Sequence, residues 1–193
     1  MDNNIIYWIW LQQILGYGNN KIKNLLSIHK NAKLFYELGY NGWKSSGFLT
    51  EKGLARAKQY SLDAVKIITD KCVKLGQSVI AFDDIKYPER LRNIDNPPCV
   101  LYVKGDLPDI ENSVAISIVG TRSAINESMK NSFDFAYELN KAGVLIISGG
   151  DVGIDESAHK GALASGGKTV CVLGNGIDVN YPRENASLRY NIS

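Results

Sequence analysis

The chain has 193 residues, of which 45% are hydrophobic. This length and hydrophobic content suffice for one core, or for one core and a small helical module. The chain contains three cysteines and has a formal net charge of +2 at pH 7. Cys72, Cys99 and Cys171 lie far apart, which argues against a secreted disulfide framework, and two histidines argue against a zinc site. The first apolar run, Ile5–Leu11, is too short to span a bilayer and no basic residue precedes it, so we expect no signal peptide, no membrane segment and a cytoplasmic protein.

Charge is unevenly distributed along the chain. Residues 1–80 carry 11 Lys and Arg against 5 Asp and Glu, whereas residues 81–193 carry 11 against 15. The basic front segment favours contact with phosphate groups. A solvated, lysine-rich helical face explains the same excess.

Residues 1–76 are predicted to form helices, because their apolar residues recur at helical spacing. The expected helices cover residues 5–15, 22–28, 32–38 and 64–75. Glycines mark the breaks between them, namely Gly16, Gly18, Gly39, Gly42 and Gly47, and Gly76 ends the last helix. We therefore predict an all-helical domain over residues 1–76.

From residue 77 onward, short apolar strands alternate with helices. Strands are expected at residues 78–82, 99–103, 114–119, 144–148 and 169–173, and helices at 127–141 and 155–165. Short continuous apolar strands separated by helices are typical of parallel strands buried on both faces. With right-handed crossovers, this pattern predicts an α/β three-layer sandwich over residues 77–193.

Three consecutive strands end in glycine-rich turns, which are Gly120-Thr121-Arg122, Ser148–Gly153 and Gly174-Asn175-Gly176. The carboxyl ends of parallel strands share one edge of a sheet, where ligands bind. Glycines in these turns let an anion approach the backbone amides closely. A helix that starts near Asp155 would point its positive N-terminal end at the same anion, and Arg122 could bind a phosphate through two parallel hydrogen bonds. The alternative is that the glycines only form tight turns.

These loops match no common nucleotide fingerprint. The GxGxxG of dinucleotide-binding proteins and the GxxxxGK[ST] of ATPases are both absent, so we expect no cofactor. Arg183, in the segment "YPREN", either reaches the same edge or is an exposed arginine at a helix start. His159 follows Asp155 by four residues, but without a nearby nucleophile we expect Asp155 to cap its helix and His159 to bond locally. No catalytic residue is predicted.

The sequence resembles the DNA-processing protein A (DprA/Smf) family. The matching text is "YPERLRNIDNPPCVLYVKGD", "SIVGTR", "AGVLIISGG", "GIDESAHKGAL" and "GGKTVCVLGNGIDVNYPREN", and it covers roughly residues 80–190. The PPxxLYxxG element before IVGTR is specific to this family.

The resemblance implies a protein that binds single-stranded DNA on a Rossmann-like domain, self-associates, loads the RecA recombinase during natural transformation, and is not an enzyme. Arg122 matches the arginine of the family's GxR element, which contacts DNA phosphate. The expected phosphate-binding residues are Gly120, Thr121, Arg122, Ser148, Gly149, Gly150, Gly153, Gly174, Asn175, Arg183 and Asn185.

This chain departs from the family pattern in three places. Asp151-Val152 stands in the second loop, where the family often has a basic residue, and Asn126-Glu127 replaces a tyrosine-glycine pair. The sequence also stops at Ser193, so the chain is expected to be either a fragment or a naturally shortened member of the family, with an incomplete domain and a smaller sheet. A homodimer is expected, if at all, in the full-length protein.

The front segment fits the resemblance as a helix-hairpin-helix or SAM-like module. "LQQILGYGNNKIKNLL" has the form of a helix, a Gly-Tyr-Gly hairpin and a helix. Such hairpins present amides to DNA phosphate, so Gly16, Gly18 and Lys21 are a predicted secondary DNA contact. Trp8 and Trp10 are expected in the core.

Two other functions remain open. The loops could hold a nucleotide monophosphate in a sensor or hydrolase on a related Rossmann-like fold, although the Ser148–Asp151 stretch differs from the PGGxGT element of such hydrolases. Alternatively, the chain is a scaffold that keeps the fold and contacts only protein.

Overall fold

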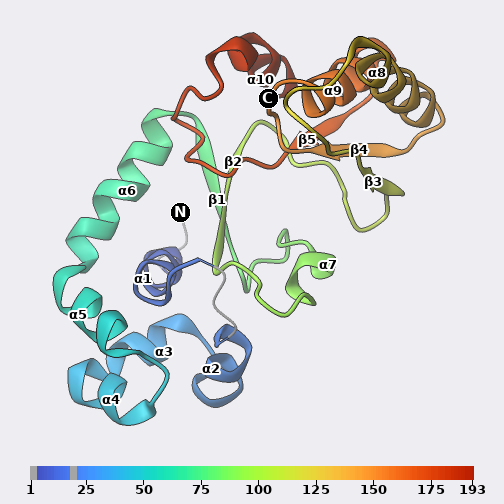
Figure 1. Ribbon diagram of the computed structural model, residues 1–193. Coiled ribbons are helices and arrows are strands. Elements are labelled where there is room, and N and C mark those ends of the chain that lie inside the picture. The colour runs from blue at the N-terminus through green and yellow to red at the C-terminus, as the bar shows by residue number, and fades with distance from the viewer. Residues whose placement is uncertain (1–3, 18–20) are drawn as a thin grey trace. The chain divides into compact units, whose positions relative to one another are not determined.

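The computed structural model describes residues 4–17 and 21–193, and these divide into two compact units, Met1–Val103 and Lys104–Ser193 (Figure 1). The boundary between the units falls at the end of the second strand, before its last residue, Lys104. Strand β1 (Gln77–Ala81) belongs to the first unit and packs on its helices. The predicted domain boundary between residues 76 and 77 stays a prediction. None of the helices in the described part of the chain combines the length and apolar character needed for a membrane span.

The first unit contains six helices before its strands within the described residues. They are α1 (Ile5–Leu15), α2 (Ile22–His29), α3 (Ala32–Glu37), α4 (Gly39–Ser46), α5 (Glu51–Gln59) and α6 (Leu62–Lys74). Three of them begin at a polar side chain that accepts from the backbone N–H of the third helical residue, the caps being Asn31, Thr50 and Ser61. The predicted break at Gly42 is wrong, because this glycine lies inside α4.

Helix α1 forms the centre of this unit. Its aromatic residues Trp8 and Trp10 are 1% and 0% exposed, which confirms that they belong to the core. Trp10 packs against Phe35 and Trp43, and its indole N–H donates to the carbonyl of Tyr60 at 3.1 Å. Burying an indole with its N–H satisfied retains the hydrophobic gain without the cost of an unpaired donor.

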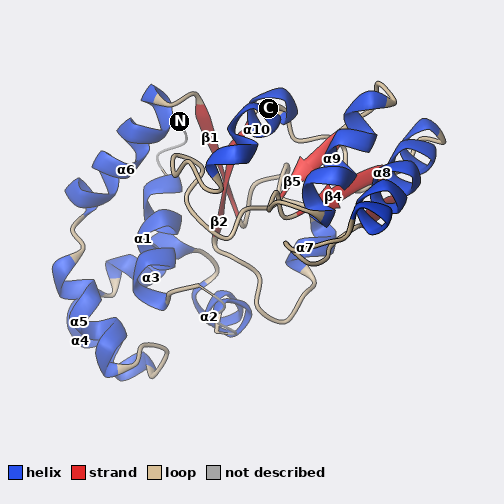
Figure 2. Ribbon diagram, turned by 45° about the horizontal axis from the view of Figure 1, so that its top comes forward, coloured by secondary structure: helices blue, strands red, loops and turns tan. Residues whose placement is uncertain are grey.

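Strand β1 pairs with β2 (Val100–Lys104), and the short helix α7 (Glu89–Arg92) lies between them in sequence. Both α1 and α6 pack against β1 (Figure 2). The buried side chain of Gln12 in α1 accepts from the amide of Cys99 at 2.7 Å, next to the start of β2. This hydrogen bond joins the helical part of the unit to its strands.

The second unit is built on a parallel sheet in the order β3 (Ala115–Ser117), β4 (Leu145–Ser148), β5 (Thr169–Cys171). Helices α8 (Asn126–Lys141) and α9 (Ile154–Ala164) lie side by side over one face of this sheet (Figure 1). A 3₁₀ turn, η1 (Arg183–Asn185), and helix α10 (Ala186–Ile192) follow, and α10 packs against α9 and β5.

The core of the second unit lies between the sheet and its two crossover helices. Ile146 of β4 and three alanines, Ala136, Ala158 and Ala162, are completely buried there. Small residues on both helices let α8 and α9 approach each other and the sheet closely. The α/β, Rossmann-like class with a parallel sheet is confirmed, and the described residues supply the sheet and the α8–α9 layer of the predicted sandwich.

Candidate phosphate-binding site

The three glycine-rich turns follow β3, β4 and β5, and we call the segments Gly120–Arg122, Ser148–Gly153 and Gly174–Gly176 together the rim. The first two are held by the carboxylate of Asp155, which is 6% exposed. Its Oδ1 accepts from the amide of Gly120 at 3.2 Å, and its Oδ2 accepts from the amide of Gly149 at 3.1 Å. These two amides therefore donate to a protein carboxylate.

Asp155 does not cap its own helix. The N-cap of α9 is Gly153, and no side chain hydrogen-bonds to the first amides of this helix. The predicted cap is wrong because the buried carboxylate gains two backbone donors on neighbouring loops, which is the more complete satisfaction of its lone pairs.

The first and second loops are in direct contact. Gly153 has φ +86°, and a Cβ atom placed on it would lie 2.5 Å from the carbonyl oxygen of Thr121. The amide of Ile154 donates to that same oxygen at 3.4 Å. A glycine is required at this position by both the backbone conformation and the close approach, so this one is explained by packing alone.

Arg122 stands exposed at the first loop, with 60% of its side chain accessible. Its Nη2 donates to Oδ2 of Asp151 in the second loop at 2.8 Å, and its Nη1 donates to the hydroxyl oxygen of Tyr181 at 3.4 Å. The hydrogen bond that Arg122 donates to Asp151, and the negative charge of Asp151, raise the pKa of the Arg122 guanidinium, which stays fully charged. One cation thus links the first loop to the second and to the segment after the third.

The third loop is held by its own polar groups. Asn175 Nδ2 donates to the carbonyls of Gly176 and Val179 at 3.0 and 3.2 Å. Asn185, which is 1% exposed, donates through Nδ2 to the carbonyl of Gly150 at 3.1 Å. Asn185 therefore supports the second loop and has no side-chain surface to offer a ligand, while Arg183 lies exposed in η1.

The predicted phosphate-binding residues differ in their access to solvent. Ser148 is 2% exposed, and its hydroxyl donates to the carbonyl of Ile118 at 2.6 Å, so it ties β4 to β3. The set divides into exposed positions (Gly120, Thr121, Arg122, Gly174, Arg183), half-buried ones (Gly149, Asn175) and buried ones (Ser148, Gly150, Gly153, Asn185).

The predicted secondary contact lies in the first unit. Gly16 ends α1 with φ +81°, and its amide donates to the carbonyl of Gln12 at 2.9 Å. The ammonium of Lys21 donates to the carbonyl of Phe48 at 2.8 Å. Gly18 lies outside the described residues.

His159 belongs to the support beneath the rim. It is 0% exposed, and its Nδ1 lies 2.8 Å from the hydroxyl oxygen of Thr169 in β5. The Thr169 hydroxyl donates its proton to the carbonyl of Ile146, so its oxygen accepts from Nδ1–H of His159. The predicted local partner is wrong, because the bond reaches from α9 to β5. Burial lowers the pKa of His159 to about 4, partly opposed by the charge of Asp155, so the ring is neutral at pH 7.

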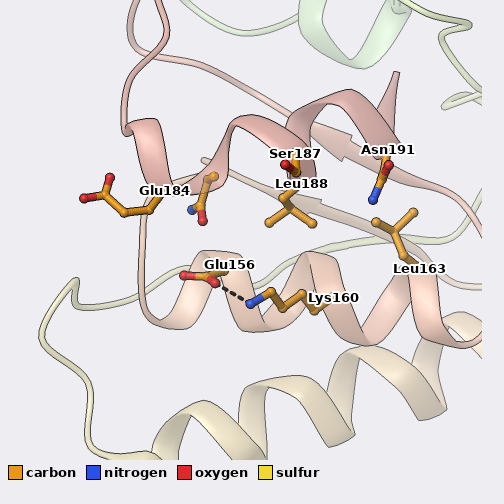
Figure 3. Close-up of a pocket in the computed structure, with 8 residues that line it drawn as sticks. Glu156, Lys160, Leu163, Glu184, Ser187, Leu188 and Asn191 are labelled. Carbon is orange, nitrogen blue, oxygen red and sulfur yellow. Dashed lines mark hydrogen bonds and ion pairs between the residues drawn. The ribbon is translucent and has the colours of Figure 1, made fainter.

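A groove of about 400 Å³ lies between α9 and the η1–α10 segment (Figure 3). Leu163 and Leu188 face each other across it, and the ion pair between Glu156 and Lys160 runs along its α9 side. Asn185 lines the groove and also bonds to Gly150, so the groove backs onto the second loop of the rim. Among residues 4–17 and 21–193, no three His, Cys, Asp or Glu side chains gather as they would around a metal ion.

Two residues beside Arg122 were not predicted as part of the site. Asp151 was identified as an anion in the loop but not as an ion-pair partner, and Tyr181, 52% exposed, was overlooked. The one available signal was an arginine and an aspartate of opposite charge in loops that share a sheet edge. Nothing in the sequence places the Tyr181 hydroxyl beside them.

A family model described as DNA recombination-mediator protein A matches residues 78–193. The Smf protein of Synechocystis sp. is 31% identical over 196 residues, which is 94% of this chain and 47% of that protein. The DNA processing protein DprA of Streptococcus pneumoniae is 37% identical over 103 residues, covering 53% of this chain and 36% of the relative. The chain thus spans about half, or less, of these relatives.

Two solved structures share the fold. The X-ray structure of DprA from Streptococcus pneumoniae covers 100% of this chain and 64% of its own, with a TM-score of 0.77 and 26% identity. DNA processing protein A from Helicobacter pylori, whose structure concerns its single-stranded DNA binding mode, covers 60% of this chain and 51% of its own. Its TM-score is 0.53 and its identity 28%.

Proposed function

The chain belongs to the family of DNA recombination-mediator protein A, and on this basis we propose that it binds single-stranded DNA at the rim. Arg122 binds a backbone phosphate, and the exposed Thr121, Gly174 and Arg183 flank the strand. Because phosphate contacts carry no sequence information, the affinity depends little on base sequence.

The observation that carries the proposal is the exposed guanidinium of Arg122 at the carboxyl edge of a parallel sheet, where ligands of this fold class bind. Its planar fork matches the geometry of phosphate oxygens. The amides of Gly120 and Gly149 add nothing directly, since both donate to Asp155. The charged contact is therefore made by side chains, and Arg122 is the principal one.

Titration of a fluorescent oligo-dT strand tests the proposal. Arg122→Ala should weaken binding about tenfold or more, the loss expected for a hydrogen bond to a charged group, and should do so for oligonucleotides of any sequence. Lys168→Ala is the matched control, because it removes an exposed cation just before β5, at the opposite end of the strands. Equal affinity of Arg122→Ala and the wild-type protein would remove the assignment.

The same titration with a nucleoside monophosphate separates this proposal from a nucleotide sensor or hydrolase. Tight binding of the mononucleotide together with none of oligo-dT would favour the sensor or hydrolase. We propose a binding protein that is not an enzyme, because the exposed groups of the rim are a cation and hydrogen-bonded loops. The hydroxyl of Thr169 does contact His159, but both residues are buried and the hydroxyl proton is donated to the carbonyl of Ile146.

The proposal extends to partners and location. The RecA recombinase and a second copy of the full-length protein are the proposed protein partners, in DNA uptake and natural transformation, and both are testable by co-purification with and without oligo-dT. Cytoplasmic location is part of the proposal and rests on Cys72, Cys99 and Cys171, none of which is in a disulfide.

A further inference from the structure

The guanidinium that would hold DNA is already engaged by the protein. Arg122 has an exposed side chain, yet both of its terminal nitrogens meet internal acceptors, Asp151 Oδ2 at 2.8 Å and the Tyr181 hydroxyl at 3.4 Å. A bidentate phosphate contact needs two parallel N–H groups of this fork. The carboxylate of Asp151 accepts from one of these nitrogens at 2.8 Å, a distance that is also usual for a charged N–H bonded to a phosphate oxygen.

We propose that Asp151 is an affinity-determining residue of the rim, which competes with DNA phosphate for Arg122 and is displaced when a strand binds. This inference rests on the proposed function of the rim. Asp151 is well suited to the role because it lies on a loop and is 30% exposed, so its carboxylate can turn into water when it is released. Half-exposed ion pairs are weak, so DNA can break this one.

The opposite role for Asp151 predicts the opposite result. If its carboxylate only held Arg122 in the orientation that receives a phosphate, its removal would weaken DNA binding. If it competes, its removal frees the fork and strengthens binding. The sign of the change in affinity therefore decides between a positioning residue and a competitor.

The experiment compares oligo-dT affinity of the wild-type protein with Asp151→Asn and Glu127→Gln. Asp151→Asn keeps the size of the side chain and removes its charge. Glu127→Gln is the control. It removes an equal charge from an exposed position in the first turn of α8, and the Arg122 fork still bonds to Asp151 and Tyr181 in this variant. We expect Asp151→Asn to raise the affinity about two- to fivefold above Glu127→Gln, the range set by exposed ion pairs.

A double-mutant cycle with Arg122→Ala separates competition from general repulsion. In the Arg122→Ala background the gain from Asp151→Asn should fall to that of Glu127→Gln, because no fork is left to release. An equal gain in both backgrounds, or a loss of affinity in Asp151→Asn, overturns the inference. Unchanged affinity in Arg122→Ala itself overturns the proposed function instead, so the two failures are distinguishable.

Discussion

The carboxylate of Asp155 occupies the place where the sequence predicts an anion. Backbone amides from two loops converge on it, Gly120 at 3.2 Å and Gly149 at 3.1 Å, as they would on a bound phosphate. The glycine pattern is therefore a correct signal for an anion site, but the anion belongs to the protein. A carboxylate in this position fixes the ends of β3 and β4 and leaves recognition of an external anion to exposed side chains.

His159 makes the stability of the fold depend on pH. Its pKa is about 4 in the folded protein because of burial, against 6.5 for a free histidine. Between these values the unfolded state binds the additional proton, so the free energy of unfolding falls as the pH falls from about 6.5 to about 4. The full effect is about 3 kcal/mol.

Urea unfolding at several pH values checks this prediction. The difference in unfolding free energy between the wild-type protein and His159→Gln should shrink by about 3 kcal/mol from pH 7 to pH 4. An NMR titration of the His159 ring gives an independent reading, and a ring that titrates near pH 6.5 in the folded protein would contradict the argument.

At the scale of elements, the sequence predicts best where large apolar residues recur. Helices α1 and α8 and strand β4 lie within about one residue of their expected bounds. Helix α5 was missed because its buried residues, Gly53 and Ala57, are too small to mark an apolar face. Helix α4 was missed because glycine is a poor helix former, yet Trp43 anchors it with its side chain 8% exposed and its indole N–H bonded to Phe35.

The site was predictable as a location but not as a set of contacts. Strand order and parallel crossovers bring the glycine loops to one edge, so Arg122 and Gly153 could be placed from the sequence. Side-chain directions in turns do not follow from residue type. For that reason the structure was needed to show two contacts, the hydrogen bond from the buried Asn185 side chain to Gly150 and the ion pair of Arg122 with Asp151.

The contact between α8 and α9 depends on Gly161. A Cβ atom on this residue would press against the carbonyl oxygen of Phe133 and lie 3.1 Å from Cβ of Ala136. In an open helix, Gly→Ala stabilises by about 1 kcal/mol. Here we expect Gly161→Ala to lower the free energy of unfolding by about 1–3 kcal/mol, because overpacking outweighs helix propensity.

Chemical denaturation of Gly161→Ala and Gly174→Ala measures the effect. Gly174 is the control, because an added methyl group there meets no atom within 4 Å, so its stability should be unchanged or slightly higher. A Gly161→Ala protein as stable as the wild type would mean that α8 and α9 can separate without cost.

At the scale of the whole molecule, the two units carry opposite net charges. Residues 1–103 hold 14 Lys and Arg against 9 Asp and Glu, a net charge of +5, whereas residues 104–193 hold 8 against 11, a net charge of −3. The unit that carries the rim is thus acidic, and two of its lysines, Lys130 and Lys160, are paired with carboxylates on their own helices. If the protein binds a polyanion, we expect its long-range attraction to come mainly from the first unit.

This distribution predicts how salt affects DNA binding. Each phosphate neutralised on a single strand contributes about −0.7 to the slope of log K against log salt, so Arg122 and Arg183 alone give about −1.4. We expect a steeper slope, with the excess supplied by exposed lysines of the first unit.

Replacing four of them by glutamine should make the slope shallower, these being Lys44, Lys52, Lys66 and Lys74. The same number of replacements in the second unit should leave it nearly unchanged, the control residues being Lys104, Lys130, Lys141 and Lys168. A wild-type slope of −1.4 or shallower would confine phosphate contact to the rim and leave the basic character of the first unit as a solvated surface.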